Sequence, residues 1–149
     1  MQPSRILPDL QCSLLCEQVR REANGNFFLI GVLDGIVLPQ FPIGLPALCV
    51  FNRWTAGVGQ FISKVRFIAP DQTTQIQQGE VKFGMQDVNR NATTLIVLQQ
   101  LKFSEPGVYH LEVSVDDVMK VRYPVPVMAV PENQKPPQSP QAPPASESD

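Results

Sequence analysis

The sequence predicts an all-β protein, a sandwich of about eight mostly antiparallel strands without a disulfide. The strongest observation lies in residues 109–127, where apolar and polar side chains alternate on either side of Asp116 and Asp117. A period of two is typical of a half-buried strand, so this segment is predicted to be a hairpin with one face on a core. The other apolar runs are short and are separated by turns rich in Pro and Gly, as in sandwiches and barrels.

The first two strands are predicted over residues 12–19 and 26–33. Between them lie Asn24 and Gly25, which both accept positive φ and therefore favour a tight turn. A helix over residues 10–21 is the alternative for the first segment, because three of its apolar residues would share one helical face.

Residues 39–47 contain three prolines and are predicted to form an irregular crossing instead of a central strand. Strands are expected next over residues 48–54, 61–68 and 74–83. In the last of these the apolar side chains change parity across Gly79, so we expect a β-bulge at this glycine.

The longest regular strand is predicted over residues 93–103. Its inward face is expected to carry four apolar side chains in phase, Leu95, Val97, Leu101 and Phe103.

The closing hairpin needs a bulge or a loop of odd length, because Val113 and Val121 both belong to its apolar row. We therefore expect Val113 opposite Val121 and Val115 opposite Met119, around a three-residue loop at 116–118. Pro124 and Pro126 lack N–H groups and share a parity, which favours an edge position for the last strand.

Length and composition divide the chain into a β-sandwich domain of residues 1–130 and a tail of residues 131–149. Six of the 19 tail residues are proline, and we expect the tail to be disordered. The spacing of Pro137 and Pro140 would also suit an SH3-type groove, but a solvated tail or linker explains it as well.

The charge distribution argues against nucleic acid as a partner. The formal net charge is −2, and the tail carries it, with three acids against one lysine. A neutral body offers no general attraction for phosphates. No apolar run is long enough for a membrane span, and three unpaired cysteines favour a cytoplasmic location.

Residues that could support chemistry are few. His110 is the only histidine and lies on the polar face of its strand, so an exposed surface role is expected. Cys12 and Cys16 have no second Cys or His pair for zinc and are expected to be small buried hydrophobes. Asp87 and the pair at the hairpin tip are explained by turn chemistry. No catalytic residue, cofactor or metal is expected, and the chain is not predicted to be an enzyme.

The one segment singled out for partner binding is the loop predicted over residues 52–59. It contains the only tryptophan, Trp54, next to Arg53, and Trp and Arg are enriched in binding hot spots. A core position for Trp54 at the end of a strand is the alternative. Arg90, in the polar loop of residues 87–91, is the third candidate.

Two resemblances extend this interpretation. The segment EPGVY, with Glu105, Gly107 and Tyr109, resembles the entry to strand F of immunoglobulin-like domains, where the tyrosine hydroxyl bonds to backbone at a corner. Leu111 replaces the disulfide cysteine of that motif, which implies an immunoglobulin-like sandwich without a disulfide. The segments CEQVRREANGNFFLIGVLDGI, FPIGLPALCVFNRW and KVRFIAPDQTT are similar to a family of small bacterial β-proteins of unknown function. That resemblance implies no activity or ligand.

The expected function is a non-enzymatic binding or assembly module with an unidentified protein partner, acting through an exposed sheet edge or the Trp54 loop. A structural subunit of a larger particle, such as a phage or secretion component, is an alternative. A small-ligand-binding or enzymatic sandwich is another. A deep pocket with convergent polar groups would favour the small-ligand-binding or enzymatic sandwich. An exposed apolar patch would favour the binding module or the structural subunit.

Overall fold

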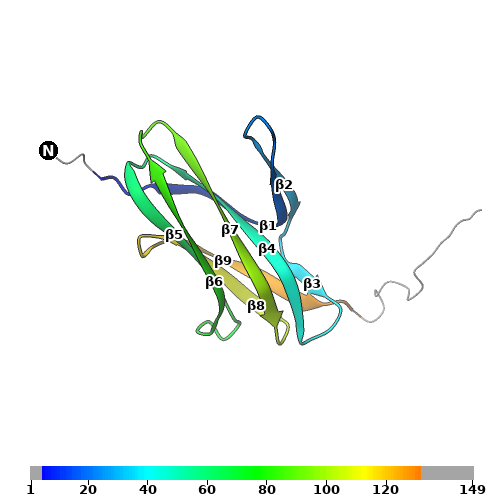
Figure 1. Ribbon diagram of the computed structural model, residues 1–149. Helices are drawn as coiled ribbons and strands as arrows, with labels where there is room; N and C mark the ends of the chain where they lie inside the picture. Colours follow the sequence, from blue (N-terminus) through cyan, green and yellow to red (C-terminus); the bar gives the residue numbers. More distant parts are fainter. Residues whose placement is uncertain (1–4, 132–149) are drawn as a thin grey trace, which may run out of the picture.

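The computed structural model describes residues 5–131, and the regular structure of this part is entirely β-strand (Figure 1). One sheet has the strand order β2-β1-β4-β7, and the other has the order β3-β9-β8-β5-β6. The strands are β1 (Asp9–Arg21), β2 (Phe27–Val32), β3 (Ile36–Leu38), β4 (Ile43–Thr55), β5 (Gly59–Ile68), β6 (Gln75–Met85), β7 (Asn91–Phe103), β8 (Gly107–Val115) and β9 (Val118–Ala129). The prediction of an all-β protein with two sheets is confirmed.

The core lies between the two sheets and draws on both of them. At its centre the rings of Phe67, Phe103 and Tyr109 pack on one another, with centroids 5.3–5.9 Å apart. Tyr109 is buried, and its hydroxyl donates a hydrogen bond to the backbone oxygen of Glu105 at 2.8 Å. The corner predicted from EPGVY is therefore present.

Residues 12–19 form part of a strand, so the helical alternative is wrong. The turn predicted at Asn24 and Gly25 is confirmed. Gly25 has φ 93° and donates from its N–H to the Glu22 oxygen at 2.9 Å, while Glu22 N–H donates to the Asn26 oxygen at 2.7 Å. Glycine suits this position because it adopts positive φ without steric cost.

The predicted irregular crossing over residues 39–47 is wrong in part. β3 precedes it and pairs with β9 in parallel, and β4 already begins at Ile43. Pro46 is tolerated because β1 pairs with β4 only from Cys49 onward, so the start of β4 has a neighbour, β7, on one side only. A proline without an N–H costs little at such an edge.

The inward face predicted for residues 93–103 is wrong in its first half. Ile96 and Leu98 are buried in the core, whereas Val97 is 53% exposed. The strand changes face near Gln100, which has φ 55°. Beyond this irregularity Leu101 and Phe103 are buried as predicted.

The bulge expected at Gly79 is displaced toward the start of β6. Phe67 pairs with Gln77 and Ile68 with Gln75, so Ile76 is the extra residue. Gly79 has a different role. A Cβ at this position would lie 2.5 Å from Cγ2 of Ile96, so the glycine lets β6 approach β7 closely.

The closing hairpin has the predicted pairing of Val113 with Val121, but its loop is shorter than expected. Val115 pairs with Val118, so Asp116 and Asp117 alone form the turn, with φ 47° and 66°. The register shifts after Val113, and this bulge restores the apolar row. A two-residue turn with two positive φ values matches the twist of a hairpin.

The edge position predicted for the last strand is confirmed along most of its length. β3 covers only Val127–Ala129, so Pro124 and Pro126 lie where β9 has a single neighbour, β8. Val130 N–H then donates to the Leu38 oxygen at 3.0 Å.

Candidate functional site

Trp54 is a core residue, which corrects the expectation of a binding loop around it. It lies within β4 and is fully buried. Its indole Nε1 donates a hydrogen bond to Thr94 Oγ1 at 3.0 Å, and its ring stacks on Phe83 with centroids 5.5 Å apart. A side chain packed in this way cannot contact a partner while the protein is folded.

Arg53 lies next to Trp54 in the strand and therefore points to the opposite face of the sheet. It is exposed, and its guanidinium donates to Gln11 Oε1 at 3.2 Å. The two residues that the sequence suggested as a pair thus share no surface.

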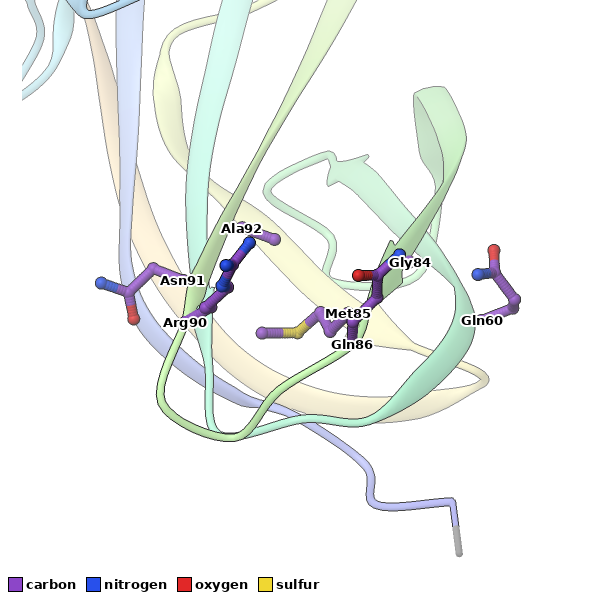
Figure 2. Close-up of a pocket in the computed structure, with 7 residues that line it drawn as sticks. All are labelled: Gln60, Gly84, Met85, Gln86, Arg90, Asn91 and Ala92. Atoms are coloured by element: carbon purple, nitrogen blue, oxygen red, sulfur yellow. The ribbon is translucent and has the colours of Figure 1, made fainter. Parts of the chain in front are cut away.

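Arg90 lies in the turn between β6 and β7, where its N–H donates to the Asp87 oxygen at 3.0 Å. It borders an open hollow of about 340 Å³ at the end of the sandwich, between these strands and β5 (Figure 2). Met85 and Ala92 supply apolar surface, and Ala92 is the register partner of the buried Trp54. The hollow is lined by Gln60, Gly84, Met85, Gln86, Arg90, Asn91 and Ala92.

This hollow offers amide groups and one ionisable side chain, the guanidinium of Arg90. Such a set can donate hydrogen bonds to a polar group. It provides no acid–base pair, which proton-transfer chemistry would require.

His110 is less exposed than expected. It lies on β8 between Ile68 of β5 and Pro124 of β9, and its Nδ1 is buried without a hydrogen-bond partner in the structure. The turn role of Asp87 is confirmed, because its Oδ1 accepts the Asn89 N–H at 2.9 Å. Among residues 5–131, His, Cys, Asp and Glu form no group of three or more that could hold a metal ion.

The feature that the sequence argument missed is the hairpin of β1 and β2, residues 17–32, which we call the arm. β1 pairs with β4 only as far as Cys16, and beyond this point its partner is β2. In Figure 1 the arm separates from β4 and projects from its sheet. Phe27, near its tip, contacts Phe51 of β4 with centroids 5.9 Å apart, so the arm curls over the outer face of the sheet.

One face of the arm presents apolar side chains to solvent. Phe28, Ile30 and Val32 are 54%, 40% and 48% exposed. They alternate along β2 with Phe27 and Leu29, which are partly covered. The uncharged run FFLIGV is the signal that could have identified this surface, because sheet edges usually carry charges or prolines.

The outer edge of β2 also presents free backbone groups. Glu22 and Asn26 form a hydrogen-bonded pair at the start of the arm. In an antiparallel ladder hydrogen-bonded and non-hydrogen-bonded pairs alternate, so Phe27 and Leu29 direct their N–H and C=O groups away from β1. Within the described residues β2 pairs with β1 alone, so these groups have no neighbouring strand to bond to.

The opposite sheet ends in β6, which is protected differently. Glu80 and Lys82 lie along β6 on its exposed side. Charges of this kind discourage pairing with a further strand. Of these two edges, β2 is the one whose chemistry favours an additional strand.

Comparison with known proteins identifies a family but no function. The model of a family of unknown function (DUF6941) matches residues 11–128. This range covers β2 to β8 completely and nearly all of β1 and β9. No curated protein matches the chain. The part of the chain that the structure describes contains no helix with the length and apolar character of a membrane span.

Proposed function

The chain belongs to this family of unknown function, and we propose that it is a non-enzymatic protein-binding module that takes up an extended partner segment along the free edge of β2. The observation that carries the proposal is the coincidence of free backbone groups and an exposed apolar row on one strand. Strand addition uses both features, since main-chain hydrogen bonds give affinity and alternate side chains give specificity.

The chemistry of the edge defines the partner segment. β2 contains no charged residue, so burying it does not strand an unpaired charge. The partner should be extended, with apolar side chains at alternate positions to meet Phe28 and Ile30. Arg20, the register partner of Phe28, would lie at the rim.

A non-enzymatic role is part of this proposal. The hollow beside Arg90 has one ionisable group, and a hollow of about 550 Å³, lined by residues that include Ile43 and Phe103, has only Lys102. A further hollow contains several charged side chains, but its Glu112 is held in ion pairs with Arg66 at 2.9 Å and Arg122 at 3.4 Å. A cytoplasmic location is also part of it, since Cys12, Cys16 and Cys49 are free thiols.

The test compares two lysine substitutions of equally exposed apolar residues. Ile30→Lys places a charge on the β2 edge, whereas Val88→Lys, at 43% exposure in the β6–β7 turn, is the matched control. The wild-type chain is used to capture proteins from an extract of the native host. The Val88→Lys variant should capture the same amount of partner, whereas the amount captured by Ile30→Lys should fall by about tenfold or more.

Hydrogen exchange on the recovered complex then locates the contact. The amides of Phe27 and Leu29 should become protected when the partner binds, because they would donate to it. Unchanged exchange at these amides, or equal loss of the partner with both lysine variants, would contradict strand addition at β2.

A further inference from the structure

Cys16 and Cys49 are directly opposite each other in the antiparallel ladder of β1 and β4. Opposed residues in such a ladder have Cα atoms about 4.5 or 5.5 Å apart. Both distances fall within the range of about 4.4–6.8 Å that disulfides span. Both residues are free thiols in the structure.

The position of this pair in the fold is informative. It is the last pair of the β1–β4 ladder, at the point where the arm leaves β4. A bond between the two sulfur atoms would fasten the base of the arm to the sheet. We propose that Cys16 and Cys49 form a reversible disulfide that fixes the arm to β4 when the protein meets an oxidising small disulfide.

Cys12 is excluded from this chemistry by distance. Its ladder partner is Arg53, four residues along β4 from Cys49, and it lies four residues along β1 from Cys16. Four residues of strand span about 13 Å, which is far beyond the reach of a disulfide. The strand geometry therefore selects one pair among the three thiols.

The reaction requires an oxidant such as oxidised glutathione. One cysteine thiolate attacks the glutathione disulfide, forms a mixed disulfide and releases one glutathione thiolate. The second cysteine thiolate then attacks the protein sulfur of that mixed disulfide and releases the other glutathione. Two cysteine protons are lost to solvent or to the released thiolates, and the two electrons from the cysteines reduce the glutathione disulfide to two thiols.

Burial sets the rate of this reaction. Cys16 and Cys49 are 0% and 6% exposed, so attack depends on local opening at the end of the ladder. Solvent lies one strand away from the cysteine pair, because Val97, the β7 neighbour of Cys49, is 53% exposed. Oxidation should therefore be slow in the native protein and faster when a low concentration of urea loosens the arm.

The experiment incubates the full chain with oxidised glutathione and maps the cysteines by mass spectrometry of unreduced peptides. We expect a peptide pair that links residue 16 to residue 49, and its loss after reduction with dithiothreitol. The linkage should persist in Cys12→Ala and be absent in Cys16→Ala and Cys49→Ala. Closing this loop should raise the Tm of the wild type by roughly 10 °C, measured without reductant.

Two outcomes would overturn the proposal. In one, Cys12 becomes glutathionylated while Cys16 and Cys49 stay free thiols, even with mild urea. In the other, the recovered link includes Cys12. The wild-type peptide map decides between these results without any variant, so a destabilised alanine variant does not obscure it. The test also leaves the strand-addition proposal untouched, because it uses no partner.

Discussion

At the scale of single residues, Trp54 shows how composition misleads about surfaces. The single tryptophan, the largest side chain in the sequence, suggests a binding loop, yet it lies in the core and its indole N–H donates a hydrogen bond to Thr94. Trp54→Ala should therefore destabilise the fold by about 3–5 kcal/mol, because it removes a large buried side chain. Arg53→Ala, one residue away on the exposed face, should change the free energy of unfolding by less than about 0.5 kcal/mol. Urea denaturation of both variants measures this, and a similar cost for the two would argue against a core role.

Tyr109 provides the second residue-scale prediction. Tyr109→Phe removes the hydroxyl that donates to the Glu105 oxygen and leaves this acceptor without its protein partner. The loss should cost about 1–3 kcal/mol of unfolding free energy. Tyr123→Phe is the comparison, since it removes a hydroxyl that is hydrogen-bonded to a side chain, Ser13 Oγ at 3.1 Å, instead of to the backbone. If Tyr109→Phe has the wild-type urea midpoint, the corner does not stabilise the domain.

Cys49 should make the free energy of unfolding depend on pH in the alkaline range. Burial, with a smaller contribution from neighbouring Cys16, raises the pKa of the Cys49 thiol to about 11. In the unfolded chain the thiol ionises near pH 9, so between about pH 9 and 11 the unfolded state binds fewer protons and stability falls. The loss attributable to Cys49 should reach about 2–3 kcal/mol.

Urea unfolding across this pH range, under reducing conditions, checks the Cys49 prediction. Burial also raises the pKa of Tyr109 and of Tyr123, so the informative quantity is the difference between the wild type and Cys49→Ala. Parallel stability curves for these two proteins would contradict the assignment to Cys49.

At the scale of elements, the sequence alone does not show whether Gly79 forms a bulge or allows close packing of two strands. A change of apolar parity showed that residues 74–83 contain an irregularity, and the structure has it at Ile76. Gly79 is small because Cγ2 of Ile96 occupies the space of its missing Cβ. Parity can be counted from the sequence, whereas contact with a strand of the other sheet cannot.

Gly79→Ala should therefore cost about 1–3 kcal/mol through overpacking. Ile96→Leu removes the Cγ2 methyl, so the same change in that background should cost clearly less. A double-mutant cycle in urea gives this coupling directly. Additive costs would show that Gly79 is not needed for the approach of β6 to β7.

The same limit explains the other errors at this scale. The strand type, the turn at Gly25 and the pairing of Val113 with Val121 follow from local patterns and were predictable. The exposed position of Val97 was not, because it depends on the positive φ of Gln100 midway along β7. The apolar run of residues 26–33 predicts a strand but does not show which of its faces is exposed, because the curl of the arm is set by tertiary contacts such as Phe27 with Phe51.

At the scale of the whole molecule, two sheets and a family of unknown function are shown, while the immunoglobulin-like relationship stays a prediction. The strand order is compatible with it. If β1, β4 and β7 are assigned as A, B and E, and β5, β6, β8 and β9 as C, C′, F and G, these seven strands have the order found in such domains, and β2 and β3 are added at the sheet edges. The missing disulfide is compatible as well, since Leu111 is buried at the cysteine position and packs with the core.

The domain boundary predicted at residue 130 also remains to be tested, and residues 132–149 lie outside the described part of the chain. Within that part, β9 ends at Ala129 and the last backbone hydrogen bond joins Val130 to Leu38. A chain ending at Pro131 keeps this bond and the whole core. Its Tm should therefore lie within about 4 °C of the full-length value.

A chain ending at Pro126 is the contrasting variant. It lacks the segment that pairs with β3 and the buried side chain of Val127, so it should melt at a clearly lower temperature. If the chain ending at Pro131 also melts more than about 4 °C below the full chain, the C-terminal residues contribute to the stability of the sandwich and the domain extends beyond residue 130.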